Sequence, residues 1–394
     1  MAGSRSRARL AGFSALAATL AATVVAGSPA AQAGVPAGPA LDRRVVVFWG
    51  ADNPALMTEA GLTGVAQVSA GGLHSLALRR DGTVWAWGNN FAGQLGDGTT
   101  TSRNTPVMVN GLTGVVQVSA GGLHSLALRS DGTVWEWGDV GAGLDPFTPI
   151  LVSGLSAVTS ISAGDLFSLA RRSDGTVWAW GDNRFGQLGD GTTAGSRLPV
   201  QVAGLSHVTS ISAGFDAALA VRTGRLAAIA SVWAWGSNSH GQLGDGTLAS
   251  HITPEQVTGI RTPFVAGISA GHQFAVVLGT DGTVWGWGAN ESGELDKTPS
   301  TAPVSRPTEL TVTGSGITQL SAGFSHVLAL RSNGTVLAWG DNSAGELGTG
   351  RNAGYAGPVQ VPVLGQVRQV SAGGLFSLAI YPQPMIITPV AVTI

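Results

Sequence analysis

Two short motifs recur along this chain at nearly constant spacing, and they limit the folds that it can adopt. Both motifs recur seven times in steps of roughly 50 residues, apart from one extra Ser-Ala-Gly at Ser343 and one extra Trp-Gly at Trp285. Ser-Ala-Gly begins at Ser69, Ser119, Ser162, Ser212, Ser269, Ser321 and Ser371, and Trp-Gly begins at Trp49, Trp87, Trp137, Trp180, Trp235, Trp287 and Trp339. A period of this length predicts a repeat array, rather than the two or three independent domains that 394 residues would otherwise suggest.

One repeat unit has the pattern of four short strands. Residues 117–121 and 124–128 form two apolar segments, and Asp131-Gly132 is a hairpin signal that leads into the alternating segment 133–137. A fourth strand that begins with Pro, as suits a sheet edge, is expected at 106–109, 199–202 and 358–361. Seven units of four antiparallel strands predict an all-β, seven-bladed β-propeller.

The two ends of the chain predict how the ring closes. Residues 45–50 contain a Trp-Gly with no Ser-Ala-Gly before it, and 370–380 contain a Ser-Ala-Gly with no Trp-Gly after it. We therefore expect a propeller over 45–380, in which the N-terminal strand completes the last blade and removes an exposed sheet edge. Residues 34–44 would be a short linker. Residues 381–394 would be a C-terminal tail, with an added outer strand at 388–392 as one option.

The first 33 residues have the layout of a secretory signal peptide. Arg5, Arg7 and Arg9 precede an apolar run over 10–25, and the small-residue segment 31–33 follows it. An N-terminal membrane anchor is the alternative. We expect a secreted or cell-envelope-associated protein, and removal of the peptide leaves 18 basic against 23 acidic residues.

Composition excludes several classes of function. The chain has no Cys, so it holds no disulfide, Cys-ligated zinc or Cys nucleophile. Its near-neutral charge argues against nucleic acid or an anionic membrane as the main partner. We expect a monomer without cofactor or metal, whose partner is an extracellular or cell-envelope protein.

One unit also carries a family resemblance. Residues 68–78, followed by 81–88 and Gly93-Gln94-Leu95-Gly96, resemble the regulator of chromosome condensation repeat. The resemblance covers about residues 45 to 380 and implies a seven-bladed propeller closed by shared terminal strands. The founder of that family is a nucleotide-exchange factor for a small GTPase. A secreted bacterial branch that resembles this fold includes a β-lactamase-inhibitory protein, which covers an enzyme's active site with one face.

Strand parity predicts which loops share a face of the propeller. The Ser-Ala-Gly turns and the loops after Trp-Gly should lie at one end, and the Asp-Gly turns at the other. Two sets of positions at the first end differ between repeats. The candidate partner-binding residues in the loops are Phe91, Arg184, Phe185, His240 and Glu291, and those expected in a ring near the axis are His74, His124, Phe167, Phe274, His326 and Phe376, with Ala217 at the seventh position.

Each set also has a purely structural interpretation. The ring residues could instead plug the channel or cap the turn, and the Asn residues of the loop frame, such as Asn90, fit turn conformations. Asp97, Asp190 and Asp245 suggest calcium, but each lacks the acidic partners of a loop site, so turn roles are favoured.

We predict no catalytic residues and no enzyme activity. Adjacent His-Ser pairs such as His74-Ser75 point to opposite faces of a strand, so they do not form a nucleophile with its base. Three of the ring histidines, His74, His124 and His326, would have to converge to bind a metal.

Two repeats depart from the pattern, over 141–147 and over 224–230, which suggests either partner orientation or neutral drift in loops. The predicted function is an exported protein–protein interaction module that uses the face with the Trp-Gly loops. The alternatives are an inhibitor of a secreted hydrolase such as a β-lactamase and, by family analogy only, an exchange-factor-like activity.

Overall fold

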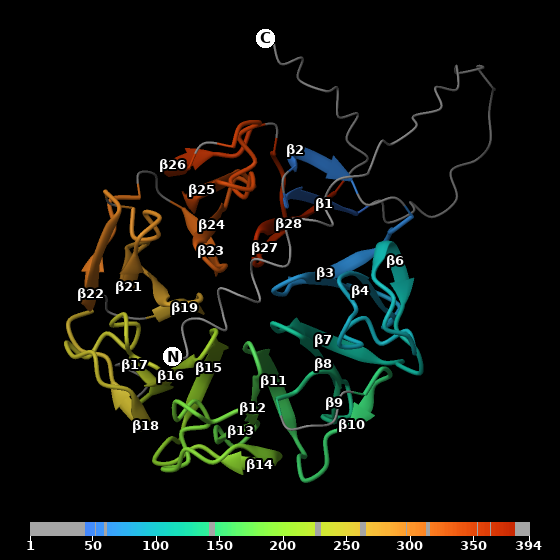
Figure 1. The fold of residues 1–394 in the computed structure, drawn as a ribbon, viewed down its shortest axis with the longest axis horizontal. Coiled ribbons are helices and arrows are strands. Elements are labelled where there is room, and N and C mark those ends of the chain that lie inside the picture. The colour runs from blue at the N-terminus through green and yellow to red at the C-terminus, as the bar shows by residue number, and fades with distance from the viewer. Residues whose placement is uncertain are drawn as a thin grey trace. The chain divides into compact units, whose positions relative to one another are not determined.

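The computed structural model describes residues 44–51, 53–58, 61–141, 146–224, 230–260, 265–296, 298–312, 316–352, 354–362 and 364–382. These residues form seven four-stranded antiparallel sheets around a central axis, as Figure 1 shows. Within these ranges the chain has strands, turns and loops but no helix. The prediction of an all-β, seven-bladed propeller is confirmed. The predicted signal peptide, most of the linker and most of the tail lie outside the described residues.

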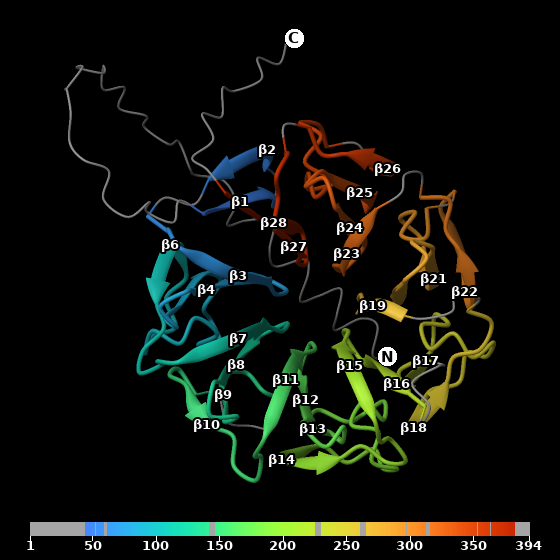
Figure 2. The same ribbon diagram turned by 180° about the vertical axis from the view of Figure 1, so that it is seen from behind.

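Blades 1 to 6 follow chain order, with the first strand of each nearest the axis (Figures 1 and 2). Blades 1 and 2 consist of β3 (Val65–Ala70), β4 (His74–Arg79), β5 (Val84–Gly88), β6 (Arg103–Met108), β7 (Val115–Ala120), β8 (His124–Arg129), β9 (Val134–Gly138) and β10 (Ile150–Leu151). Blades 3 and 4 consist of β11 (Val158–Ala163), β12 (Phe167–Arg172), β13 (Val177–Gly181), β14 (Ser196–Gln201), β15 (Val208–Ala213), β16 (Ala217–Thr223), β17 (Ala230–Gly236) and β18 (His251–Gln256). Blades 5 and 6 consist of β19 (Val265–Ala270), β20 (Phe274–Gly279), β21 (Val284–Asn290), β22 (Ser300–Glu309), β23 (Ile317–Ala322), β24 (His326–Arg331), β25 (Val336–Asp341) and β26 (Tyr355–Gln360).

Blade 7 combines the two ends of the described chain. Its inner strands are β27 (Gln369–Ala372) and β28 (Phe376–Tyr381), and its outer strands are β1 (Val45–Gly50) and β2 (Asn53–Thr58). β1 pairs with β28 along its whole length, from Val45 opposite Tyr381 to Gly50 opposite Phe376. The outermost position is occupied by β2, a strand that the sequence analysis did not identify, and the suggested strand at 388–392 lies outside the described residues.

Strand register confirms which loops share a face. His74, the first residue of β4, lies opposite Gly88, the last residue of β5, and Asn89 donates a backbone hydrogen bond to the Leu73 carbonyl at 2.9 Å. The Ser-Ala-Gly turns and the loops after Trp-Gly therefore lie at one end, which we call the Trp-Gly face. The Asp-Gly turns lie at the opposite end, where Gly82 adopts a φ of 79° that favours glycine.

The core lies between neighbouring blades, and the Trp of each Trp-Gly motif is its largest component. Trp137 of blade 2, for example, is fully buried in a cluster with Leu76 and Leu95 of blade 1. Burying a Trp removes about 200 Å² from water, so these residues contribute strongly to blade packing. The indole N–H also donates to a backbone carbonyl in the loop of the preceding blade, and these pairs are Trp137 to Gln94, Trp235 to Gln187, Trp287 to Gln242, Trp339 to Glu294 and Trp49 to Glu346.

The Ser of each Ser-Ala-Gly motif links the inner strands of neighbouring blades. The Ser69 hydroxyl accepts a hydrogen bond from the backbone N–H of Ala120 at 2.9 Å, and the same contact recurs at all seven junctions. At the last junction the donor is Ala70 and the acceptor is Ser371, which joins blade 7 to blade 1. The motif therefore recurs because each inner strand uses it to bind the next.

The first irregular repeat has lost part of its outer edge. β10 is only two residues long, and the Gln-Leu-Gly segment that blade 1 carries at 94–96 has no counterpart after Trp137. At the junction with blade 3, the Trp180 indole donates instead to the buried carboxylate of Glu136 at 2.6 Å. The second irregular repeat extends the hairpin of β16 and β17, and its residues 225–229 lie outside the described residues.

Candidate functional site

The predicted inner ring does not line the axis. His74, His124, Phe167, Phe274 and His326 are at most 2% exposed, and Ala217 is also buried; Phe376 is half-buried. Each of these residues begins the second strand of its blade, so its side chain packs between blades instead of facing the channel. The expectation that they form an accessible ring is therefore wrong for the buried members, and so is the alternative that they plug the channel.

The three ring histidines bind serines of the next blade. His74 Nε2 lies 2.8 Å from Ser125 Oγ, and His124 and His326 make the same contact with Ser168 and Ser377 at 2.9 Å. Burial lowers the pKa of His74 and of His326 to about 3, with a further small effect of His124 on His74. Burial likewise lowers the pKa of His124 to about 4, against the opposing effects of the Asp165 carbonyl and Asp139. These imidazoles are neutral and sit on separate blade junctions, so they do not converge on a metal.

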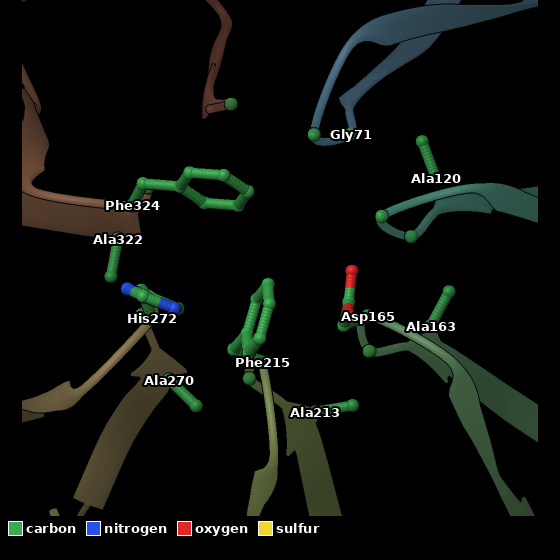
Figure 3. A pocket seen from close by; sticks show the side chains of 18 of the residues that line it. Gly71, Ala120, Ala163, Asp165, Ala213, Phe215, Ala270, His272, Ala322 and Phe324 are labelled. Atoms are coloured by element: carbon green, nitrogen blue, oxygen red, sulfur yellow. The ribbon is translucent and has the colours of Figure 1, made fainter. Parts of the chain in front are cut away.

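The channel opens on the Trp-Gly face in a small cavity of about 80 Å³, lined by the last residues of the inner strands and by the turns that follow (Figure 3). Pockets that enclose a drug-sized ligand measure roughly 300–1,000 Å³. The cavity therefore suits the end of one side chain better than a whole small molecule.

The residue directly after each Ser-Ala-Gly decides the character of this cavity. We call these seven the tip residues, and they are Gly72, Gly122, Asp165, Phe215, His272, Phe324 and Gly374 in blades 1 to 7. Three consecutive blades thus present glycine, whereas the other four present an acid or a ring. The predicted ring residues lie three positions after the motif's glycine, whereas the tip residues lie one position after it.

Three tip residues form an aromatic cluster on one side of the cavity. The rings of Phe215 and His272 lie edge to face with centroids 4.2 Å apart, and His272 and Phe324 stack at 5.3 Å. Figure 3 shows Phe215, His272 and Phe324 pointing toward the cavity from successive blades, with the Asp165 side chain beside them. Burial, with a smaller effect of nearby His240, lowers the pKa of His272 to about 4, so this ring is neutral.

Backbone hydrogen bonds between blades hold the tips in place. Gly72 N–H donates to the Gly121 carbonyl and Gly374 N–H to the Gly71 carbonyl, both at 3.0 Å. Phe324 N–H donates to the following blade in the same way, at 3.1 Å. The turns that carry the tip residues are therefore held by backbone hydrogen bonds to the next blade.

Carboxylates adjoin the cluster on the side of blades 3 and 4. Arg184 forms an ion pair with Asp182 at 2.7 Å, and the charges of Asp216 and Asp165 also reach the Arg184 guanidinium. Burial and the negative charge of Asp182 raise the pKa of Asp216 to about 6, although Arg184 opposes this. Three acids thus share one guanidinium.

A second cavity adjoins the other side of the cluster. It is lined by His272 and Phe324 together with Glu291 and Glu294 of the blade 5 loop. Burial raises the pKa of the Glu294 carboxyl, and the nearby negative charges of Asp341 and Glu291 add to this effect. Both flanks of the aromatic cluster are therefore acidic.

The loop candidates lie on the same face and remain accessible in part. Phe91, Arg184 and Glu291 are exposed, whereas Phe185 and His240 are half-buried. Their loops are held by the Asn frame: Asn90 Oδ1 accepts from Leu95 N–H at 2.9 Å, and its amide donates to the Thr99 carbonyl at 3.0 Å. The structural interpretation of this Asn position is confirmed.

The acidic loop residues have turn roles. Asp97 Oδ1 accepts from the backbone and hydroxyl of Thr99, and its Oδ2 binds Arg103 at 2.9 Å. Asp245 binds Thr247 and His251 in a similar way, and Asp190 binds Thr192. Among the residues that the structure describes, no three His, Cys, Asp or Glu side chains are grouped to hold a metal ion, and no helix could cross a membrane.

Comparisons with known proteins agree with this architecture. The human probable E3 ubiquitin-protein ligase HERC6 is 33% identical over 159 residues, which is 39% of this chain and 16% of that protein. The ultraviolet-B receptor UVR8 of Arabidopsis thaliana is 31% identical over 122 residues, which is 31% of this chain and 28% of the receptor. The chain thus spans less than a third of the length of these curated relatives, both of which are eukaryotic.

Solved structures resemble the fold over most of the chain. Prp20p from Saccharomyces cerevisiae superposes with a TM-score of 0.76 at 23% identity, over 88% of this chain and 93% of Prp20p. Human WBSCR16 superposes with a TM-score of 0.76 at 21% identity, over 87% of this chain and all of its own. At these identities the likeness shows the fold alone.

Family models match the chain directly. Two models of the regulator of chromosome condensation (RCC1) repeat match residues 81–128 and 65–94. A third, described as the RCC1-like domain, matches residues 143–385, which is more than half of the chain. Together with the seven four-stranded blades, this match means that the chain belongs to the RCC1-like domain family.

Proposed function

We propose that this chain is an exported protein-binding module, and that an extracellular or cell-envelope protein docks on its Trp-Gly face. The signal-peptide pattern of residues 1–33 supports the exported location. Membership of a propeller family supports binding only in a general way, because one fold serves many functions.

The observation that carries the proposal is the contrast between frame and variable positions on this face. The Asn residues that hold the loops are buried and repeated, whereas the positions beside them change from Phe91 to Arg184 to Glu291 and are exposed. A rigid frame that presents different aromatic and charged side chains is typical of a protein-binding surface, since such residues dominate binding energy at interfaces.

An exposed apolar pair extends this surface outward. Phe91 of blade 1 and Phe147 of blade 2 are 53% and 44% exposed. Phe147 packs against Gly93 in the same loop as Phe91, so the two rings come from adjoining segments. Aromatic side chains of this kind supply large contact area when a partner covers them.

The proposal is tested by capture from the medium and envelope of the secreting cell, with the mature chain as bait. A double variant, Phe91→Ser with Phe147→Ser, should retain at least tenfold less of the captured protein, because it removes two exposed aromatic contacts. Leu198→Ser is the matched control, since Leu198 is 63% exposed but lies on outer strand β14.

Two outcomes would contradict the proposal. One is that no protein is retained by the unaltered chain, and the other is that the loop variant retains as much partner as the unaltered chain. If the captured partner is a secreted hydrolase whose activity falls at a stoichiometric amount of this chain, the module acts as its inhibitor.

A further inference from the structure

We propose that the channel mouth receives one cationic side chain, an arginine or a lysine, from the protein that docks on the Trp-Gly face. This inference rests on the proposed function and specifies the chemistry of the partner. It starts from the asymmetry of the cavity, which is lined by Gly72 and Gly122 in blades 1 and 2 and by Asp165, Phe215, His272 and Phe324 in blades 3 to 6. Figure 3 shows these last four side chains at the cavity.

The aromatic cluster offers π surfaces to a cation. Phe215 stands nearly perpendicular to both of its neighbours, at 84° to His272 and 86° to Phe324, and its centroid lies 5.8 Å from that of Phe324. Rings in this arrangement present faces in more than one direction. A guanidinium or ammonium group within about 6 Å of such a face is attracted by the ring quadrupole, and the attraction strengthens where water is excluded.

The charges around the cluster favour the same ligand. Asp165 lines the cavity, and Asp182 and Asp216 lie close enough to Arg184 for their charges to act on it. On the opposite flank Glu291 and Glu294 line the adjoining cavity. Arg184 offsets one of these carboxylates, which leaves an excess of negative charge on both sides of the neutral rings. A partner of complementary charge is therefore favoured at this position.

The glycine side of the cavity argues against an anion. Anion sites on backbone need several free N–H groups that point at the ligand. Here the N–H groups of Gly72, Gly122 and Gly374 already donate to carbonyls of the next blade, at 3.0 Å each. The glycine tips add no side chain to the cavity, so this side of the channel mouth stays open for an incoming side chain to reach the rings.

Binding can be measured with small probes that differ in charge but little in shape. The full mature chain, with ¹³C-labelled phenylalanine, is titrated with acetyl-arginine amide, acetyl-lysine amide and the neutral isostere acetyl-citrulline amide. We expect saturable shifts of the Phe215 and Phe324 ring signals with the two cations and not with citrulline. Phe324→Leu, which keeps an apolar side chain, and Asp165→Asn, which keeps the shape, should each weaken binding of the cations by roughly two- to thirty-fold.

Leu198→Ser serves as the control variant, because Leu198 lies on outer strand β14 away from the cavity lining, and it should bind the cations like the unaltered chain. Equal shifts with citrulline, the absence of saturable shifts, or unchanged binding in both cavity variants would overturn the inference.

The two proposals fail separately. If the loop variant releases the captured partner but the cations do not bind, protein docking stands and the cation pocket falls. If the cations bind but no partner is captured, the chemistry of the pocket stands without the proposed function.

Discussion

Two blade junctions that perform the same task are built differently. Between blades 1 and 2, the Trp137 indole and the Ser125 hydroxyl both donate to the Gln94 carbonyl, at 2.8 and 2.9 Å. His74 of blade 1 binds the same Ser125. Because the only hydroxyl proton of Ser125 goes to Gln94, His74 must donate its Nε2–H. The junction between blades 6 and 7 repeats this arrangement with Trp49, Glu346, Ser377 and His326.

Between blades 2 and 3 the Gln-Leu-Gly segment is missing, and a side chain takes over the role of the carbonyl. Glu136 stands where blades 1 and 3 have Ala86 and Ala179, and its carboxylate accepts the Trp180 indole. The carboxyl is buried, and burial raises its pKa. A buried indole N–H needs a hydrogen-bond acceptor. A repeat can therefore lose the loop that carries the acceptor carbonyl when another side chain provides an acceptor in its place.

The largest expected effect removes the Trp from either junction. Trp137→Ala and Trp180→Ala should each lower the free energy of unfolding by about 3–5 kcal/mol, because both rings are fully buried and their loss leaves a cavity. Urea denaturation measures both values. Similar costs would mean that the two designs are equivalent in packing. A cost below about 1 kcal/mol at one junction alone would mean that the Trp does not have the same role in the two junctions.

The sequence predicted the architecture because the repeated features are local. Alternating apolar residues, Asp-Gly turns and two motifs with one period sufficed for seven blades of four strands. The roles of the motifs were harder to predict, since Ser69 and Gln94 bind residues of the next blade, 51 and 43 positions away in the chain.

The site was predicted in part. The exposed loop positions Phe91, Arg184 and Glu291 follow from the variation between repeats. The buried position of His74 could not be predicted, because the alternation of apolar and polar residues along a strand does not show whether a side chain faces the channel or the neighbouring blade. The tip residues, such as Phe215, were missed since each is a single variable residue beside an invariant motif.

The next effect tests whether Glu136 replaces the missing loop. Glu136→Ala restores the residue type of the neighbouring repeats but leaves the Trp180 N–H without its acceptor, so it should cost about 1–3 kcal/mol of unfolding free energy. Glu136→Gln keeps an acceptor oxygen and is the matched control, with an expected cost under about 1 kcal/mol.

The pH dependence of this pair has a defined sign. The pKa of Glu136 is higher in the folded state than in the unfolded state. Protonation of Glu136 therefore stabilises the fold at pH values below the unfolded-state pKa. This contribution is lost as pH rises through the folded-state pKa. The unaltered chain should therefore gain stability relative to Glu136→Gln as pH falls from neutral. The opposite trend, or an Ala variant as stable as the Gln variant, would mean that the carboxylate has no such role.

The smallest effect concerns the histidine of the regular junction. Blades 3 and 5 carry Phe167 and Phe274 at the position that corresponds to His74, so His74→Phe gives blade 1 the residue type of those blades. Burial lowers the folded-state pKa of His74 to about 3, and its neutral form therefore stabilises the fold above the unfolded value of 6.5. This contribution is lost as pH falls below 6.5, by about 1.4 kcal/mol between about pH 7.5 and 5.5.

Urea denaturation at both pH values should show a smaller loss of stability in His74→Phe than in the unaltered chain, and Leu198→Ser should match the unaltered chain. An identical loss in His74→Phe would mean that His74 can be protonated within the folded protein without a cost in stability, contrary to what its burial indicates.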